Sequence, residues 1–532
     1  KEQKRKPFVA CEETLSPEFQ VCDTIHIPYY TWIQVSDATA PAEKRTYCDH
    51  ELELHNFEMV SRAPTQHCFP PLHYVAFDIE TWTPKVGAYR RVPKGTFEED
   101  VVFCICSVLR NADETVGRVV HYLQNAPAPP QVEQGEELRL FQNQKELIND
   151  WRDMVVKFDT DILTGYNAKA YDLLFMSGKM TPKRDRFFDM SRIIGFACKV
   201  KEGQFQSRAF GSNVLVKVEM PGRAFVDFFE WIKRSKKLRS YKLDDVAELY
   251  LNKKKLKLGT TELDAYEWLF QSYELGCPKR CTKLVQYCFR DVDLVFDLMD
   301  HFHVMLELRN MAMITWTQIQ DLVERGQSVK VMQTLAIEAH QHGFLCDPVH
   351  ARPKPLKGGA VRSPKHGYYH DNSQCDEGVM TLDFQSLYPS IIRQHNLCFS
   401  TIVYTKVAQL HKEEQQRLFQ LDELQARLCD CFVSPQIRLG LLPQILERLH
   451  HQRLAVKKEM KMYKRQMFLN AKNTVAHTQA EREFHNQNAK QLAIKVTMNS
   501  IYGFTGTTFG YNCPTIARTT TAIGRHMIAQ TE

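Results

Sequence analysis

His73-Tyr-Val-Ala-Phe-Asp-Ile-Glu-Thr81 is the stretch of sequence that decides the fold. Its apolar residues predict a β-strand, in which successive side chains point to opposite faces. Asp78 and Glu80 therefore share one face, and the apolar residues that alternate with them from Val75 to Ile79 share the other and can pack on a core. Two carboxylates this close repel each other unless a cation neutralises them. Alone the pair is a weak indication, because a solvated strand end gives the same pattern.

Two further segments strengthen the case for a metal site. Thr164-Gly-Tyr-Asn-Ala-Lys-Ala-Tyr-Asp172 follows a predicted strand that breaks at a glycine and enters a helix. Tyr287-Cys-Phe-Arg-Asp291 lies inside a predicted helix, where a spacing of four residues puts Tyr287 and Asp291 on one face. Two-metal nucleases use carboxylates from several segments to hold two ions ~3.5–4 Å apart.

In order and spacing, the three segments resemble the Exo I, Exo II and Exo III motifs of the DnaQ/RNase H-like 3′–5′ exonuclease domain of family B DNA polymerases. The resemblance implies four catalytic, metal-binding carboxylates, at Asp78, Glu80, Asp172 and Asp291. It also implies that Asn167 contacts the unpaired 3′ end of DNA. Tyr287 is expected to orient the attacking water by a hydrogen bond and not to deprotonate it, because the pKa of a free tyrosine is about 10. The stretch Gly222–Asp227 also resembles the family between its second and third motifs.

A second site is indicated by Thr381-Leu-Asp-Phe-Gln-Ser-Leu-Tyr-Pro-Ser-Ile-Ile392. We expect a strand over Val379–Phe384, followed by a tight turn and a helix. Backbone amides exposed in such a turn can cradle a triphosphate. This segment resembles polymerase region II of family B.

The region II resemblance implies a role for each residue of the turn. Asp383 is a catalytic metal ligand, the Phe384 carbonyl also binds metal, and the amides of Ser386 and Leu387 bind phosphates. Tyr388 lies under the sugar and excludes a 2′-hydroxyl by sterics, which selects deoxynucleotides. An aromatic residue that caps a core at the turn is the alternative interpretation of Tyr388.

The long charged segment 444–500 predicts a helical hairpin with its tip near Asn470–His477. Arg453 and Lys457 lie four residues apart on one helix face. The facing helix carries three more candidates at i, i+4 and i+7 within Lys495-Val-Thr-Met-Asn-Ser-Ile-Tyr-Gly503. Each cation alone would ordinarily be solvated surface charge. The segment resembles region III of the family, however, and the resemblance assigns to the nucleotide pocket Arg453, Lys457, Lys495, Asn499 and Tyr502.

The resemblance covers about residues 73–532 and extends to stretches typical of the delta-type and herpesvirus-type polymerases, such as His395-Asn-Leu-Cys398. It implies a multidomain α/β and α+β fold. Residues 1–72, with β-like runs such as Ile25–Trp32, are expected to begin a β-rich N-terminal domain. The expected domains are the first part of the N-terminal domain (1–72), the exonuclease domain (73–305), the returning N-terminal segment and linker (306–355), the first part of the palm (356–439), the helical-hairpin fingers (440–508) and the returning palm segment (509–532).

Composition sets broad limits on the protein. The formal net charge is +6, from 69 Lys and Arg against 63 Asp and Glu, which does not by itself indicate nucleic-acid binding. The sixteen cysteines do not form the paired motifs of zinc sites, and we expect them to be buried reduced thiols in an intracellular protein. We expect no signal peptide and no membrane span.

The resemblance implies a DNA-directed DNA polymerase with a proofreading exonuclease. Each active site would use two Mg²⁺ ions, with Mn²⁺ as a substitute. The substrates would be primer–template DNA and dNTPs, with a sliding clamp or processivity subunit as partner. The location would be the nucleus, or the host nucleus for a viral enzyme.

This sequence departs from the family's pattern at one motif. The region I sequence Tyr-Gly-Asp-Thr-Asp-Ser does not occur, and the sequence stops inside a predicted helix, Thr519–Glu532. Three explanations are open: a fragment of a longer chain, one half of a split polymerase completed by a second chain, or a homologue that no longer synthesises DNA. Two rival functions are an exonuclease whose polymerase part only clamps DNA, and a non-enzymatic replication scaffold.

Overall fold

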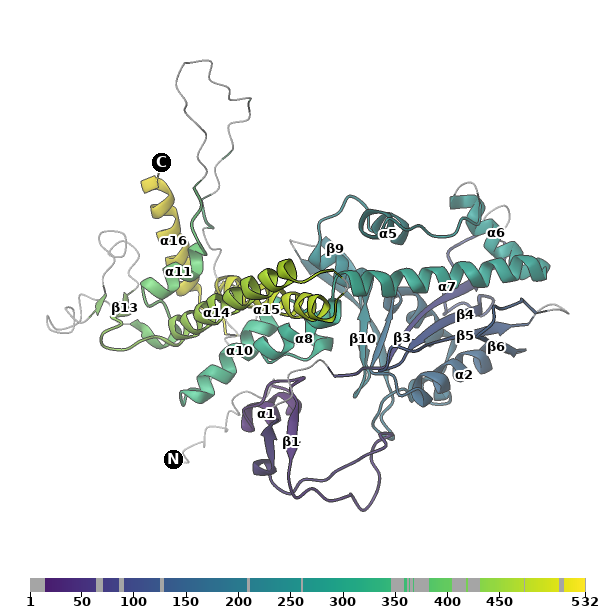
Figure 1. The fold of residues 1–532 in the computed structure, drawn as a ribbon, viewed down its shortest axis with the longest axis horizontal. Coiled ribbons are helices and arrows are strands. Elements are labelled where there is room, and N and C mark those ends of the chain that lie inside the picture. Colours follow the sequence, from purple (N-terminus) through teal and green to yellow (C-terminus); the bar gives the residue numbers. More distant parts are fainter. Residues whose placement is uncertain are drawn as a thin grey trace, which may run out of the picture. The chain divides into compact units, whose positions relative to one another are not determined.

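The structure, a computed structural model (Figure 1), describes most of the chain: residues 15–63, 70–85, 90–124, 129–207, 211–259, 262–345, 358–360, 363, 367, 382–403, 418–419, 431–472, 474–506 and 511–531. The chain divides into two compact units. The sheet unit comprises Trp32–Met305 and Ile319–Glu324, and the helical unit comprises Lys1–Thr31, Leu306–Gln318 and Arg325–Glu532. The six domain ranges expected from the sequence are finer than this division and remain predictions.

A six-stranded mixed sheet forms the centre of the sheet unit, in the order β10-β7-β3-β4-β5-β6. Strand β3 is central, antiparallel to β4 on one side and parallel to β7 on the other. The strands are β3 (Tyr74–Trp82), β4 (Val101–Arg110), β5 (Val116–Leu123), β6 (Glu136–Phe141), β7 (Ile162–Gly165) and β10 (Ala224–Asp227).

Helices cover both faces of this sheet, with α7 (Pro278–His301) on one side and α2 (Gln144–Lys157) on the other (Figure 1). Phe77 of β3 packs against Trp151 of α2, with ring centroids 4.8 Å apart. On the opposite face of β3, Glu80 is only 5% exposed. A solvated strand end therefore does not describe the Asp78 and Glu80 pair, because the acidic face of β3 is covered.

The sheet unit contains further short elements around the central sheet. They are β1 (Ile33–Val35), β2 (Val60–Arg62), β8 (Lys199–Ser207), β9 (Gly211–Glu219), α3 (Leu174–Lys179), α4 (Phe228–Ser235), α5 (Leu243–Leu251), α6 (Glu262–Leu275), α9 (Ile319–Glu324), the 3₁₀ turns η1 (Phe57–Met59) and η3 (Arg186–Phe188), and the π-helical turn η2 (Lys169–Leu173).

The helical unit contains the expected hairpin, in which α14 (Leu441–Leu469) packs along α15 (Val475–Thr505) (Figure 1). Asn470 ends the first helix, and the Thr474 side chain accepts a hydrogen bond from the His477 amide to begin the second. The other elements are α1 (Pro17–Thr24), α8 (Val304–Thr315), α10 (Gln327–Gln341), α11 (Leu387–Gln394), α16 (Pro514–Thr531), the 3₁₀ turn η4 (Phe399–Thr401), and the strands β11 (Ile402–Val403), β12 (Leu418–Phe419) and β13 (Cys431–Val433).

Two expectations about local structure need correction. The β-like run Ile25–Trp32 contains no strand, because Ile25 ends α1 and Tyr30 adopts a positive φ of 59°, which interrupts extended backbone. In the strand expected over Val379–Phe384, the residues up to Thr381 lie outside the described part, and Leu382–Phe384 form no strand. Among the described residues, no helix is long and apolar enough to cross a membrane.

Candidate active sites

Strand β3 presents Asp78 and Glu80 to the face of the sheet that α7 covers. Their neighbours on β4 are Cys106, opposite Asp78, and Cys104, opposite Glu80. Directly opposed residues of antiparallel strands point to the same face. Two carboxylates therefore lie beside two thiols, beneath a helix and away from bulk solvent.

Asp172 joins this pair from the π-helical turn η2. Its Oδ1 accepts a hydrogen bond from the backbone amide of Ile79, at 3.0 Å. Single π-helical turns are rare in proteins, and those that do occur are often found at functional sites. The strand before the turn must end in glycine, because a Cβ on Gly165 would lie 2.5 Å from the Ala168 Cβ and 2.9 Å from the Phe77 carbonyl oxygen.

Helix α7 contributes Asp291 and Tyr287 one turn apart, and a lysine that the sequence analysis did not identify lies between them. The Lys255 ammonium forms an ion pair with Asp291. It also lies 4.9 Å from the centroid of the Tyr287 ring, within range of a cation–π interaction. The Lys255 amide donates a 2.7 Å hydrogen bond to Asp244 of α5, which anchors the loop that carries the lysine.

The acids of this cluster resist ionisation together. Burial, with the negative charge of Asp291, raises the pKa of Asp78 from 3.8 to about 7. Burial and Asp78 raise the pKa of Glu80 and of Asp172 well above their usual range. Burial also raises the pKa of Asp291, although Lys255 opposes this. A cluster of buried carboxylates with one lysine has the hard oxygen donors and the excess negative charge that suit divalent cations.

The loop with Asn167 is held by Asp227, a buried residue at the end of β10. Asn167 has a positive φ of 61°, and its amide donates a 3.0 Å hydrogen bond to the Asp227 carboxylate. The amides of Lys169 and Phe229 donate to the same carboxylate, at 2.9 and 3.0 Å. One acid thus caps α4 and fixes the entry into the turn that carries Asp172.

The region II residues lie at the beginning of α11 in the helical unit. Asp383 is exposed in the preceding loop, together with the half-buried Phe384. Ser386 adopts left-handed backbone angles, φ 53° and ψ 52°, at the N-cap, and no side chain caps the helix. Pro389 occupies the first turn, where its lack of an N–H is tolerated. The first amides of α11 are therefore available to an anion.

The region II and region III residues meet through two tyrosines. The rings of Tyr388 on α11 and Tyr502 on α15 have centroids 4.2 Å apart. Lys495 and Asn499 are exposed on α15, and Lys457 is half-buried on α14. Arg453 of α14 donates a 3.5 Å hydrogen bond to Gln491, one turn before Lys495, so the two basic stretches lie on adjoining helices.

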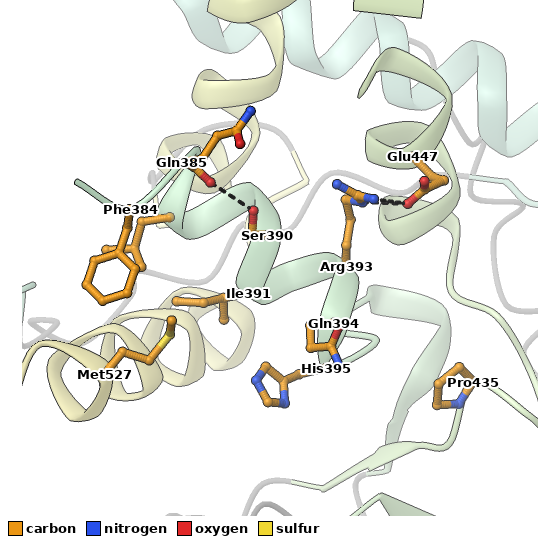
Figure 2. Close-up of a pocket in the computed structure, with 11 residues that line it drawn as sticks. Phe384, Gln385, Ser390, Ile391, Arg393, Gln394, His395, Pro435, Glu447 and Met527 are labelled. Carbon is orange, nitrogen blue, oxygen red and sulfur yellow. Dashed lines mark hydrogen bonds and ion pairs between the residues drawn. The ribbon is translucent and has the colours of Figure 1, made fainter. Parts of the chain in front are cut away.

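A separate cavity of about 620 Å³ lies on another face of α11 (Figure 2). Arg393 and Glu447 form an ion pair at its wall, with the Nε and Oε2 atoms 2.6 Å apart. Of the residues expected to bind nucleotide or metal, only Phe384 and Leu387 line this cavity. It is therefore not the pocket indicated by Tyr388 and the basic residues.

Comparisons with known proteins match two segments of the chain to one family; Lys255, Tyr287 and Asp291 lie between the matched segments. Residues 20–246 match the exonuclease domain of DNA polymerase family B, and residues 317–532 match DNA polymerase family B itself. The chain belongs to the family B DNA polymerases.

The family B relatives include the catalytic subunit of DNA polymerase delta from several organisms. The chain is 30% identical to that subunit from Mesocricetus auratus over 526 residues, which is 96% of this chain and 43% of the relative. It is 32% identical to that from Schizosaccharomyces pombe over 471 residues, which is 87% of this chain and 39% of the relative. The chain thus spans less than half the length of these curated relatives.

A solved family B structure has the same fold. The DNA polymerase of the hyperthermophilic archaeon Pyrobaculum calidifontis aligns with a TM-score of 0.65 at 20% identity, over 98% of this chain and 57% of that one. The multidomain α/β expectation is thereby confirmed.

Proposed function

We propose that this family B chain is a DNA-directed DNA polymerase with a 3′–5′ proofreading exonuclease. One observation supports the exonuclease part above all others. Four carboxylates from three separate elements, β3, η2 and α7, gather in one buried cluster. They are Asp78, Glu80, Asp172 and Asp291, and the first three have a raised pKa that the charge of a neighbouring acid helps to raise.

The exonuclease reaction would hydrolyse the last phosphodiester bond of a frayed 3′ end. The acids would hold two Mg²⁺ ions, or Mn²⁺ in their place, and bound ions of this kind lower the pKa of water and stabilise the leaving oxygen. Tyr287 would orient the attacking water, since burial and Asp291 raise its pKa and keep the phenol protonated. Asn167, fixed by Asp227, would contact the terminal nucleotide.

The polymerase part would bind the triphosphate of a dNTP between α11 and the hairpin. Asp383 and the Phe384 carbonyl would bind metal, and the amides of Ser386 and Leu387 would bind phosphate at the uncapped N-terminus of α11. Positive side chains there would stabilise the charge that develops on pyrophosphate. They are Arg453, Lys457 and Lys495, with Asn499 and Tyr502 beside the base pair and Tyr388 under the sugar.

The cellular setting follows from the same assignment. Primer–template DNA and dNTPs would be the substrates, and the chain would act in a nucleus, in the cell or in the host of a virus. A sliding clamp or processivity subunit, and a second polymerase chain, are the partners that this role would engage.

The exonuclease is tested by measuring how fast single-stranded DNA is shortened from its 3′ end. With Mg²⁺, the protein should shorten a 5′-labelled strand, and Asp78→Ala should reduce the rate about 100-fold or more. The matched control is Asp297→Asn on α7, whose acid forms a surface ion pair with Lys253 at 2.6 Å. It should keep the wild-type rate.

The outcomes separate the rival functions. Equal shortening, or none, by the protein and by Asp78→Ala would contradict the proposed exonuclease. No shortening by either would favour the scaffold. Shortening without extension of a primer by dNTPs is the result expected for an exonuclease whose polymerase part only clamps DNA, and also for one half of a split polymerase tested without its second chain.

A further inference from the structure

Three thiols from two elements gather beside Asp78 and Glu80, on the same face of the sheet. Cys104 and Cys106 of β4 have sulfur atoms 3.8 Å apart. Cys288 of α7 interacts with both of them. The Cys288 thiol also faces Asp78, with its sulfur 3.5 Å from the carbonyl oxygen and 3.8 Å from Oδ2. The exonuclease acids therefore have sulfur neighbours as well as oxygen neighbours.

One of these thiols completes a three-ligand set with two of the acids. Ligand atoms of Asp78, Glu80 and Cys288 all lie within 4.8 Å of one another. Tetrahedral Zn²⁺, with bonds to sulfur and oxygen of ~2.3 and ~2.0–2.2 Å, holds its ligands about 3.5 Å apart. Side-chain movements of about 1 Å would bring the three ligand atoms to one ion and leave its fourth coordination position open.

The chemistry of the set differs from that of the site proposed for proofreading. Mg²⁺ takes oxygen ligands and has little affinity for sulfur, whereas a thiolate selects softer cations. Asp78 and Glu80 would belong to both sets, so the two kinds of ion would exclude each other. The thiol proton of Cys288 would leave to solvent as the sulfur–metal bond forms.

We propose that Cys288, with Asp78 and Glu80, binds a thiophilic divalent cation such as Zn²⁺, and that this ion inhibits the exonuclease by occupying its acids. Zn²⁺ bound at this site would inhibit the proposed exonuclease even when Mg²⁺ is in excess. The inhibition rests on the proposed exonuclease function, but the binding does not.

Binding is measured without any reaction. The full chain is titrated with Cd²⁺, and the sulfur-to-cadmium charge-transfer absorption is recorded. Cys288→Ser should lose the tightest phase of this absorption, or weaken it about tenfold or more. The control is Cys281→Ser, on the same helix two turns earlier. Cys281 is also buried, and its thiol donates instead to the Ser272 carbonyl, at 3.4 Å.

Inhibition is measured with Zn²⁺ in excess Mg²⁺, each rate divided by the zinc-free rate of the same variant. The protein and Cys281→Ser should be inhibited at the same Zn²⁺ concentration, and Cys288→Ser should need about tenfold more. Equal cadmium absorption in all three proteins would overturn the proposal, as would equal zinc sensitivity.

Two further measurements keep the outcomes distinct. If Cys288→Ser unfolds, Glu80→Gln replaces it in the cadmium titration, and an unchanged affinity there would also overturn the proposal. If the protein has no exonuclease activity in Mg²⁺, the proposed function fails, but the cadmium titration still decides whether the sulfur-containing site exists.

Discussion

The backbone amide of Ile79 donates a hydrogen bond to the Asp172 carboxylate at 3.0 Å, across 93 positions of sequence. Ile79 lies between Asp78 and Glu80 on β3, so this bond sets where the third acid stands relative to the other two. A buried amide that lost this acceptor would be left without a partner, at a cost of about 1–3 kcal/mol, so the bond holds Asp172 in place. The fold itself therefore arranges these three acids at the proposed exonuclease site.

Metal-free protein should become less stable as the pH rises. The folded state raises the pKa of Asp78 from 3.8 to about 7, so it keeps a proton that the unfolded chain has already released. When the native state binds more protons, the free energy of unfolding falls with increasing pH, here between about 4 and about 7. Glu80 and Asp172 act in the same direction. In chelator, the melting temperature should be lower at pH 8 than at pH 6.

Asp78→Asn cannot ionise and should reduce this pH dependence. Mg²⁺ should reduce it as well, because the ion neutralises the acids that lose protons. A melting temperature of metal-free protein that rises from pH 6 to pH 8 would show that the acids ionise without penalty.

Lys255→Met should destabilise the metal-free sheet unit. The ammonium pairs with Asp291 beside the other buried acids, so its removal leaves negative charge uncompensated. We expect a loss of about 2 kcal/mol at pH 8, less than for a fully buried pair because Lys255 is partly exposed. Lys253→Met, which breaks a surface ion pair with Asp297, is the control and should cost about 1 kcal/mol or less. Urea unfolding in chelator measures both, and equal losses would count against the role of Lys255.

Asp227→Asn should affect stability and activity together. The side chain accepts three amide hydrogen bonds, and loss of its charge should cost about 2 kcal/mol. Asp100→Asn is the control, because Asp100 is equally buried and accepts hydrogen bonds from Thr83 at 2.7 Å and from the Lys94 amide at 2.6 Å.

Both variants should unfold more easily, but only Asp227→Asn should slow 3′ shortening, by about tenfold, because it releases the turn that carries Asp172. The rates are compared at a temperature at which both variants are folded. The same rate in both variants would limit Asp227 to a structural role.

Tyr388→Ala should weaken discrimination between deoxynucleotides and ribonucleotides. The Tyr388 ring lies against Tyr502, and its proposed place under the sugar excludes a 2′-hydroxyl. We expect the preference for dATP over ATP to fall about tenfold, measured as a ratio of dissociation constants. The control is Tyr463→Ala, near the C-terminal end of α14, which should keep the wild-type ratio. A preserved ratio in Tyr388→Ala would remove Tyr388 from sugar selection.

Sequence periodicity was sufficient where a residue's partners lie on its own element. Alternation placed Asp78 and Glu80 on one face of β3, and helical spacing placed Tyr287 and Asp291 on one face of α7. The Asn470–His477 tip of the hairpin could be predicted equally well, since polar residues there separate two long helical patterns. Motif resemblance then supplied the family, which the comparisons confirm.

Partners from distant segments could not be found in this way. Lys255 belongs to a run of three lysines, and nothing local distinguishes the one that reaches Asp291. The cysteines lack zinc-motif spacing along the sequence, yet the packing of α7 on β4 brings Cys288 to Cys104 and Cys106, which share one face of that strand. The expectation of strand structure in Ile25–Trp32 was wrong, because a hydrophobic pattern does not indicate that a helix ends at Ile25.

Because of the π-helical turn Lys169–Leu173, the proposed exonuclease site should be sensitive to the number of residues in this turn as well as to their identity. Such a turn holds one residue more than an α-helical turn, and the surplus residue aims Asp172 at β3. In-frame loss of a single codon there would let the turn relax to a regular helix and swing the acid by roughly 100°. On the proposed function, such a deletion would abolish proofreading and raise the mutation rate with every acidic residue of the site still encoded.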